Sequence, residues 1–583
     1  MTAFPLRRLG LLALAVLLAA APPAHAQDYD FTVPDVTDTY ALENARVVQA
    51  PGNVLESATV VVHDGLIESV GPDVEVPYDA RRIDADSLTV YAGFIDGLSH
   101  AGVDMPEAEN EENGDDEIDP GNPPFDAAGI QPDRSVRSFL TPDASGLEGL
   151  RKAGFTAGHV VPEGQMLPGA GALALYGGTS ASDMVLDADA SLFGQIETAD
   201  GYVYPATEMA VIAKMRQLYR EAERRQELET AYERTPTGQP RPPQDPVHSA
   251  LFPVLDGDTP LAYYADGALP IHRVLDLQQE LGFPLILAGL AESHATIDAL
   301  QDTDAPLFLP LDLPEAPTRS AEGDTTVADT TDTPSRYYRP EFRVPTYEDV
   351  PEEEENLELR HAVERQDYLE TAATLHEAGL RFGFTTREAD AGDVREHLRT
   401  MIDEGLPESV ALAALTTRPA SVLGLTNRLG TVEEGKIANL VVTDGSYFAE
   451  DTKVQHVFVD GELYDYSADE GGGEVSGDVS KVLGTWSYTL ETPQGERSGT
   501  LSIEGDASGL EGTLTNSQGD ESELESISFD GTTLSFTVSP EQGPSLSTTV
   551  TVEGDTFEGS VSTPGPSLSI TGERTSAPNT MRK

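Results

Sequence analysis

The sequence predicts an α/β protein whose central domain is a parallel sheet covered by helices, followed by a second domain made only of strands. Between about residues 93 and 425, short apolar strands alternate with helical stretches, which is the pattern of strands joined by helical crossovers. Residues 483–574 instead contain about eight alternating strands at roughly ten-residue spacing. That spacing predicts an antiparallel barrel or sandwich.

The remaining elements follow from local composition. Residues 28–91 contain β-branched runs and a hairpin turn signal at His63-Asp64-Gly65, and residues 429–465 return to strands. The stretches expected to form helices are 206–231, 272–281, 362–379, 392–404 and 407–422. Three acidic or Pro-rich stretches are expected to be long loops or disordered segments, namely 104–124, 232–247 and 314–355.

The net charge of the chain is strongly negative. Its 36 Lys and Arg residues face 101 Asp and Glu residues, which gives −65. Such a surface repels a polyanion, so nucleic acid is excluded as a partner. Like charges at this density strain a compact fold in dilute salt, and 1 M salt shortens the Debye length to about 3 Å. We therefore predict a halophilic protein. The alternative, a tail that captures cationic ligands, fits less well because the acidic residues are spread along the chain.

The N-terminus has the pattern of a signal peptide. Arg7 and Arg8 precede an apolar run over 9–21, and Ala24-His25-Ala26 offers a small-x-small cleavage site. The run falls short of the roughly 20 residues that a transmembrane anchor needs. No later segment is apolar enough to cross a bilayer, so no membrane span is expected. The absence of cysteine excludes disulfides, thiolate metal sites and cysteine nucleophiles. We predict an exported protein, periplasmic or extracellular.

Two motifs carry a resemblance to a known family. Residues 90–100, V-Y-A-G-F-I-D-G-L-S-H, resemble the first barrel strand of the amidohydrolase superfamily of metal-dependent hydrolases. Residues 417–425 and 428–442 resemble its final helix and its return to a β domain. The motifs stand in the expected order, and the resemblance covers about residues 40–465. It implies a (β/α)₈-type barrel with a composite β-sandwich built from both flanks.

Composition and resemblance together divide the chain into six segments. In order, these are a signal peptide (1–26), a composite β-sandwich (27–92 with 427–466), the barrel (93–426), a linker (467–480), a C-terminal all-β domain (481–575) and a tail (576–583). The only tryptophan, Trp486, is expected to plug one end of the C-terminal core rather than to bind a ligand.

The resemblance implies hydrolysis of a C–N bond in a small-molecule or peptide-like substrate. One divalent metal such as zinc would activate water at the C-terminal mouth of the barrel. The family takes two His from the first strand, one each from the fifth and sixth, and an Asp from the eighth. His100 is the remaining first-strand His, and His159, which ends a strand-like run, is the second candidate metal ligand. Glu388 and Asp390 are the acids nearest the eighth strand, while Asp96 is expected to make a structural hydrogen bond.

Other ligand positions of the family hold different residues here. Leu98 replaces the first His. Thr386 lies near the position where the family has its eighth-strand Asp, and Tyr264 lies where a fifth-strand His is expected. A hydrolytic zinc site needs about three protein ligands. Lys152 and Lys214 lie in helical contexts, so neither supplies a carbamylated ligand. The alternative hypothesis is a catalytically degenerate barrel, a pseudoenzyme that holds no metal and acts as a periplasmic or extracellular binding protein.

Overall fold

The computed structural model describes most of the chain. The described ranges are 39–105, 119–314, 365–467 and 479–576, with short gaps at a few single residues and turns. Outside them lie the predicted signal peptide, most of the predicted loop 104–124, nearly all of 314–355 and of the linker, and the tail. Within these ranges, no helix combines the length and the apolar character that a membrane crossing requires.

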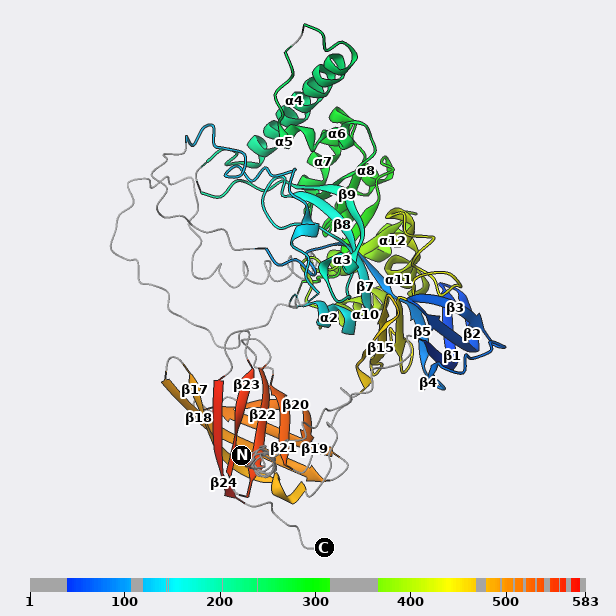
Figure 1. Cartoon of the computed structure of the whole chain (residues 1–583), viewed down its shortest axis with the longest axis vertical. Helices are drawn as coiled ribbons and strands as arrows, with labels where there is room; N and C mark the ends of the chain where they lie inside the picture. Colours follow the sequence, from blue (N-terminus) through cyan, green and yellow to red (C-terminus); the bar gives the residue numbers. More distant parts are fainter. Residues whose placement is uncertain are drawn as a thin grey trace, which may run out of the picture.

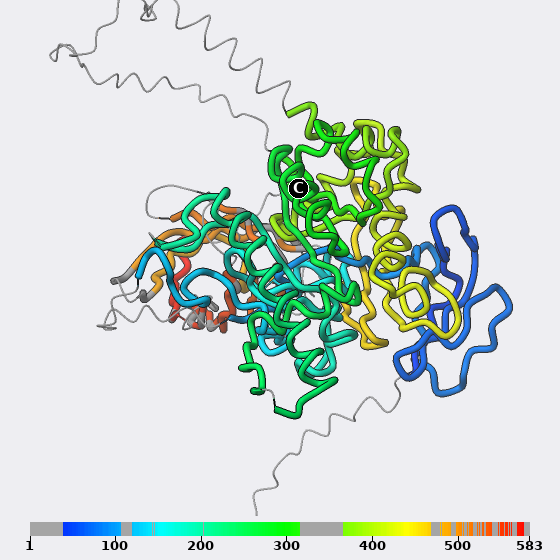
Figure 2. Tube along the Cα trace, turned by 90° about the horizontal axis from the view of Figure 1, so that it is seen from above, coloured from blue at the N-terminus to red at the C-terminus, as the bar shows by residue number. Residues whose placement is uncertain are grey.

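Strands from both flanks of the barrel form one mixed eight-stranded sheet. The strands are β1 (Tyr40–Ala50), β2 (Asn53–His63), β3 (Leu66–Gly71), β4 (Arg81–Asp84), β5 (Thr89–Ala92), β14 (Leu440–Thr443), β15 (Val454–Val459) and β16 (Glu462–Asp465). β5 pairs with β1 on one side and with β14 on the other, which joins the two chain segments. Figures 1 and 2 show the N-terminal strands, in blue, projecting from one side of the barrel. The packing of this sheet as a two-layer sandwich stays a prediction.

The hairpin predicted at His63-Asp64-Gly65 is confirmed. This turn joins β2 to β3, and Asp64 and Gly65 have φ angles of 47° and 78°. Two consecutive positive φ angles are the requirement of a type I′ turn, whose twist matches the strands that it connects.

The central barrel is built from eight strands in chain order. They are β6 (Phe94–Ser99), β7 (Phe155–Val160), β8 (Gly169–Leu175), β9 (Val185–Gln195), β10 (Leu261–Tyr264), β11 (Leu285–Ala288), β12 (Leu307–Pro310) and β13 (Phe382–Thr385). All ladders are parallel except the two of β8, which runs antiparallel to β7 and β9. The prediction of a wholly parallel sheet is therefore wrong at β8. The link 161–168 is shorter than the dozen or more residues that a parallel crossover needs.

The first and last barrel strands are joined through side chains. The Thr385 hydroxyl of β13 donates a hydrogen bond to the Leu98 carbonyl of β6. Inside the barrel, Phe308 packs in an apolar cluster with Leu98 and Phe193. A Cβ atom at Gly97 would lie 1.9 Å from the Phe308 ring, so only glycine fits there.

Each of the five stretches predicted to be helical contains a helix, and the described residues contain five further short helices that were not predicted. The helices are α2 (Leu147–Lys152), α3 (Ala181–Met184), α4 (Glu208–Arg234), α5 (Pro246–Ser249), α6 (Phe252–Leu255), α7 (Ala268–Leu281), α8 (Ile297–Gln301), a helix over 365–377, α10 (Val394–Asp403), α11 (Glu408–Leu415) and α12 (Thr417–Val422). Short 3-10 turns lie at Val136–Ser138, Ser293–Thr296 and Val479–Lys481.

Helix boundaries differ from the prediction in three places, one of which is the start of α7 at Ala268 instead of residue 272. The stretch 407–422 forms two helices because the chain leaves helical geometry at Thr416, where φ is −126° and ψ is −82°. The helix α4 starts at its N-cap Thr207, whose hydroxyl accepts a hydrogen bond from Ala210 N, and it ends at Arg234. Its last turn therefore lies inside the stretch 232–247 that the composition assigns to a loop.

The C-terminal domain is a closed antiparallel barrel, shown in orange and red in Figure 1. Its strands are β17 (Gly484–Thr492), β18 (Gly495–Asp506), β19 (Gly509–Asn516), β20 (Glu521–Phe529), β21 (Thr533–Val538), β22 (Leu546–Glu553), β23 (Thr556–Ser562) and β24 (Leu568–Ser576). β24 pairs with β17 and closes the ring, so the alternative of a sandwich is settled in favour of a barrel. Trp486 is 1% exposed in the core of this barrel, as predicted.

Candidate functional site

A pocket of about 510 Å³ opens at the C-terminal end of the central barrel. Residues that end or directly follow strands β9 to β13 line it, among them Gln195, Tyr264, Gly289, Pro310 and Arg387. Barrels of parallel strands place their active sites at this end, because the loops that follow the strands converge there. The pocket is therefore the first place to look for a function.

Arg387 is held in the wall of this pocket by several contacts. Its guanidinium carbon lies 3.9 Å from the centroid of the Tyr264 ring, a cation–π contact. Nε donates to His100 Nε2 at 3.0 Å, and Nη2 donates to Gln195 Oε1 at 3.1 Å. The Glu388 carboxylate lies 3.5 Å from Nε. The Arg387 side chain is only 13% exposed, so these contacts fix a largely buried positive charge in the pocket wall.

His100, the first candidate metal ligand, has protein partners at both ring nitrogens. Nδ1 lies 2.8 Å from the Val161 carbonyl, which can only accept, so Nδ1 carries the proton. Nε2 is then the acceptor that faces Arg387. Burial and the charge of Arg387 lower the pKa of His100 and outweigh the effect of the Val161 bond. The ring is neutral, and its lone pair is directed at a cation.

His159, the second candidate, is fully buried on β7. Its Nδ1 lies 3.3 Å from the Gly97 carbonyl, and its Nε2 lies 2.7 Å from Ser191 Oγ. Burial lowers the pKa of His159 to about 4, so the imidazole is neutral. It does not line the mouth pocket. The structure thus places His100 directly after β6 and His159 on the neighbouring strand β7, but each ring has its own partners. A shared metal stays a prediction that this geometry does not favour.

Asp96 makes the structural hydrogen bonds that were predicted for it. Its fully buried carboxyl accepts from Thr386 Oγ1 and, at 3.1 Å, from Thr386 N. Leu98 N at 3.2 Å and the Tyr176 hydroxyl at 3.3 Å also donate to it. Burial raises the pKa of Asp96 to about 7, although these bonds act in the opposite direction. Thr386, near the expected position of the family's acid, therefore ties β13 to β6.

The two acids predicted near the eighth strand have different locations. Glu388 lines the mouth pocket next to Arg387. Asp390 is exposed, and its Oδ1 accepts from Gly392 N at 2.8 Å, as in a local turn. The pocket also contains four carboxylates that sequence reasoning missed: Glu197, Glu208, Asp266 and Asp312.

Arg387 and Gln195 were also missed by sequence reasoning. A signal for both is their position, since each lies at or just after the C-terminal end of a barrel strand. Searching for polar residues at the C-terminal ends of barrel strands would have found both, without reference to the ligand set of a known family.

The donor set of this mouth does not fit a divalent metal. In the part of the chain that the structure describes, no group of three or more His, Cys, Asp and Glu residues is arranged to hold a metal ion. Leu98 is buried in the apolar barrel core, where a first-strand ligand would be needed. Arg387 places a fixed positive charge against His100, and this charge repels a cation at the same place.

The fold and the position of the pocket define a barrel of the (β/α)₈ type, in which the loops after the C-terminal ends of the strands form the binding or active site. A solved structure of similar fold is an amidohydrolase from Thermotoga maritima MSB8, with a TM-score of 0.56 and 20% identity, over 73% of this chain and 100% of the other. Residues 342–464 match the model of the amidohydrolase family. Residues 342–464 are thus similar in sequence to the amidohydrolase family, and the central barrel shares the fold of the Thermotoga protein.

Curated relatives match over short stretches only. An imidazolonepropionase of Salinispora tropica is 39% identical over 57 residues, which is 10% of this chain and 14% of the relative. A dihydroorotase of Anaeromyxobacter dehalogenans is 39% identical over 61 residues, again 10% of this chain and 14% of the relative. Because the chain matches so little of their length, these relatives do not assign an activity to it.

Proposed function

We propose that the central barrel binds a small zwitterionic, peptide-like molecule at its mouth and does not perform metal-assisted hydrolysis. The observation that carries this proposal is the guanidinium of Arg387, which is stacked on Tyr264 and donates to His100 Nε2. It occupies the mouth as a built-in cation. A binding protein needs such a group, whereas a metal cage would be weakened by it.

The charges around the pocket explain the choice of ligand. Guanidinium groups bind carboxylates through charge-assisted hydrogen bonds. Among the described residues, Nη1 of Arg387 has no hydrogen-bond partner, so this nitrogen is available to a ligand carboxylate. Asp266, Asp312 and Glu197 lie in the same pocket and favour an ammonium group. A molecule with both charges, such as a short peptide or an amino acid, can pair with the Arg387 guanidinium and with the carboxylates of the pocket.

We further propose that this protein works outside the cytoplasm in concentrated salt. The basic-apolar-small pattern of residues 1–26 and the net charge of −65 support this location. Salt screens long-range repulsion between carboxylates, while the buried Arg387 contact is screened less.

Calorimetric titration of the full-length protein in high salt tests the proposed function. The probe is alanyl-alanine, compared with its N-acetyl and C-amide derivatives, each of which lacks one charge. We expect the free dipeptide to bind most tightly. Arg387→Gln should weaken its binding about ten- to a hundredfold, because a hydrogen bond to a charged group contributes about 1.5–3 kcal/mol. Arg220→Gln, at an exposed arginine of α4 that pairs with Glu280, is the matched control and should leave binding unchanged.

The second candidate function is hydrolysis of a C–N bond, which the family match favours. Elemental analysis and a turnover assay with the same dipeptide separate the two. Near-stoichiometric zinc, manganese or iron that His100→Ala removes, together with release of free alanine, would establish hydrolysis and overturn the binding-only proposal. Metal-free protein that binds the dipeptide without cleaving it would support the proposal.

A further inference from the structure

We propose that the C-terminal barrel is a second binding site, for a small apolar molecule that carries one anionic head group. A cavity of about 340 Å³ lies within the ring of strands β17–β24. Its lining is mainly apolar and consists of Tyr488, Leu490, Arg497, Ser498, Leu514, Asn516, Val538, Leu546, Thr548, Val561 and Ile570. Closed barrels of eight strands have interiors wide enough for one small ligand. This site does not depend on the function proposed for the central barrel.

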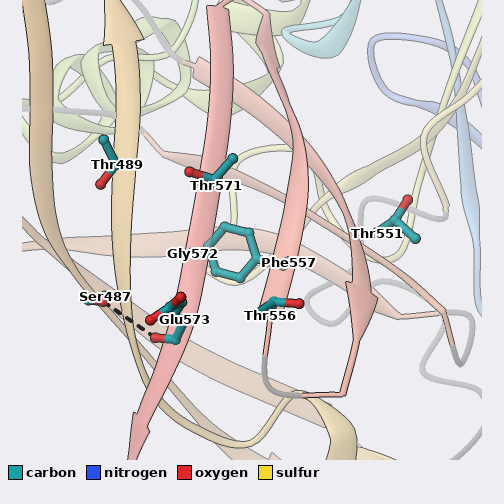
Figure 3. Close-up of a pocket in the computed structure, with 8 residues that line it drawn as sticks. All are labelled: Ser487, Thr489, Thr551, Thr556, Phe557, Thr571, Gly572 and Glu573. Atoms are coloured by element: carbon teal, nitrogen blue, oxygen red, sulfur yellow. Dashed lines mark hydrogen bonds between the residues drawn. The ribbon is translucent and has the colours of Figure 1, made fainter.

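Strand alternation places these side chains on the inner face. Along β17, Trp486 and Tyr488 are buried and Ser487 between them is exposed. Along β24, Ile570 is buried and Thr571 is exposed. Figure 3 shows Ser487 and Thr571 with the other residues that line a separate, polar depression of about 470 Å³ on the same strands. The apolar cavity therefore uses inward-facing residues of these strands, whereas Ser487 and Thr571 lie on the outward face.

The two ends of the barrel differ. Trp486 closes one end, since its Nε1 donates to the Val482 carbonyl at 2.9 Å and its ring packs 5.5 Å from that of Phe557. The Arg574 guanidinium covers the same ring at 4.2 Å. At the other end, Leu490, Leu514 and Leu546 are only partly buried. A ligand would enter at this leucine end and be stopped by the tryptophan end.

Polar groups are placed at the entrance and inside the cavity. Arg497 pairs with Leu490 in the β17–β18 ladder and shares the inner face of β18 with Leu501 and Ile503. This register puts a guanidinium at the leucine end, where a ligand's anionic head would lie. Deeper inside, the Thr548 side chain is 4% exposed and lines the cavity. A hydroxyl at that depth offers one hydrogen bond to an otherwise apolar occupant.

Energy transfer from the single tryptophan tests this site in the full-length protein. The probe is 8-anilinonaphthalene-1-sulfonate, which has an apolar body and an anionic head. Because Trp486 lies at the floor of the same barrel, its excitation should produce probe emission that saturates at one equivalent. Decanoate should displace the probe, and decyltrimethylammonium, with the opposite head charge, should displace it at least tenfold less effectively. Absence of saturable transfer would overturn the proposal.

Two variants locate the probe. Leu514→Glu puts a carboxylate into the cavity and should weaken probe binding at least tenfold, whereas Thr489→Glu, on the alternate face of β17, should not. Equal effects of the two would place the probe outside the cavity and overturn the proposal. Arg497→Gln, at an exposed rim position, should weaken decanoate binding several-fold and leave decanol binding unchanged. This variant decides the head-group assignment even where Leu514→Glu disturbs folding, and equal loss for both ligands would refute the assignment.

Discussion

Replacing Thr386 by valine tests how the central barrel is closed between β13 and β6. The substitution keeps the shape of the side chain and removes the hydroxyl that donates to the buried Asp96 carboxyl. The backbone donors from Thr386 N and Leu98 N remain. The perturbation therefore removes one hydrogen bond to a single titratable group.

The expected loss of stability depends on pH. A hydrogen bond to a charged group contributes about 1.5–3 kcal/mol, and one between neutral groups about 0.5–1.5 kcal/mol. Burial raises the pKa of Asp96 from 3.8 to about 7, so its carboxyl is mostly protonated at pH 5 and mostly ionised at pH 8.5. A carboxyl whose pKa is raised by folding destabilises the fold as pH rises through that range. Removing the Thr386 donor raises this pKa further, so the variant should lose about 1–2 kcal/mol more at pH 8.5 than at pH 5.

Urea unfolding followed by helical circular dichroism measures this difference, because the helices belong to the central barrel and its neighbours. Thr416→Val is the matched control. The Thr416 hydroxyl is equally buried but donates to the Leu412 carbonyl at 2.6 Å, which does not titrate. The control should lose the same free energy of unfolding at both pH values. If Thr386→Val behaves like the control, the carboxyl–hydroxyl link does not close the barrel as argued.

Three further outcomes are expected. Burial holds the pKa of His159 at about 4 against 6.5 in the unfolded chain, so this histidine by itself should cost the fold about 3 kcal/mol as pH falls from 6.5 to 4, opposite in sign to the contribution of Asp96. In chemical denaturation, the free energy of unfolding of His159→Gln minus that of wild type should therefore rise by about 3 kcal/mol over this pH range, and a constant difference would contradict the assignment. Melting in 0.1 M and 3 M NaCl should give a higher midpoint in the concentrated salt, where the Debye length is below about 3 Å rather than about 10 Å; equal midpoints would refute the halophilic reading of the charge. Trp486→Ala should destabilise the C-terminal barrel by about 3–5 kcal/mol, seen as faster amide hydrogen exchange in β17–β24 with exchange in α4 unaffected.

Much of the fold follows from local pattern. The helices predicted over 206–231 and 392–404 correspond to α4 and α10 within a few residues. The direction of β8 was not predictable in this way, because periodicity locates a strand without giving its orientation. Orientation was set by the short link 161–168, which cannot make a crossover. Loop length carried the information that the hydrophobic pattern lacked.

The site was less predictable than the fold, for a physical reason. Missing donors at Leu98, Thr386 and Tyr264 could be found by comparing residue types with a known pattern. The role of Arg387 could not, since it depends on contacts with residues 287 and 192 positions away in the chain, His100 and Gln195. Nothing in the local sequence of β13 distinguishes a guanidinium that points into a barrel from one that points into water.

These contacts also determine what restoring metal ligands in this barrel would require. Leu98→His would restore one donor, but it would do so in the apolar core around Phe308, where an imidazole has to find its own partners. Thr386→Asp would bring a second carboxyl against the buried Asp96, and two carboxyls in contact raise each other's pKa. Either change would still leave Arg387 donating to His100. The features of this mouth that do not fit a metal therefore reinforce one another, and each of these two single substitutions is expected to lower the stability of the fold.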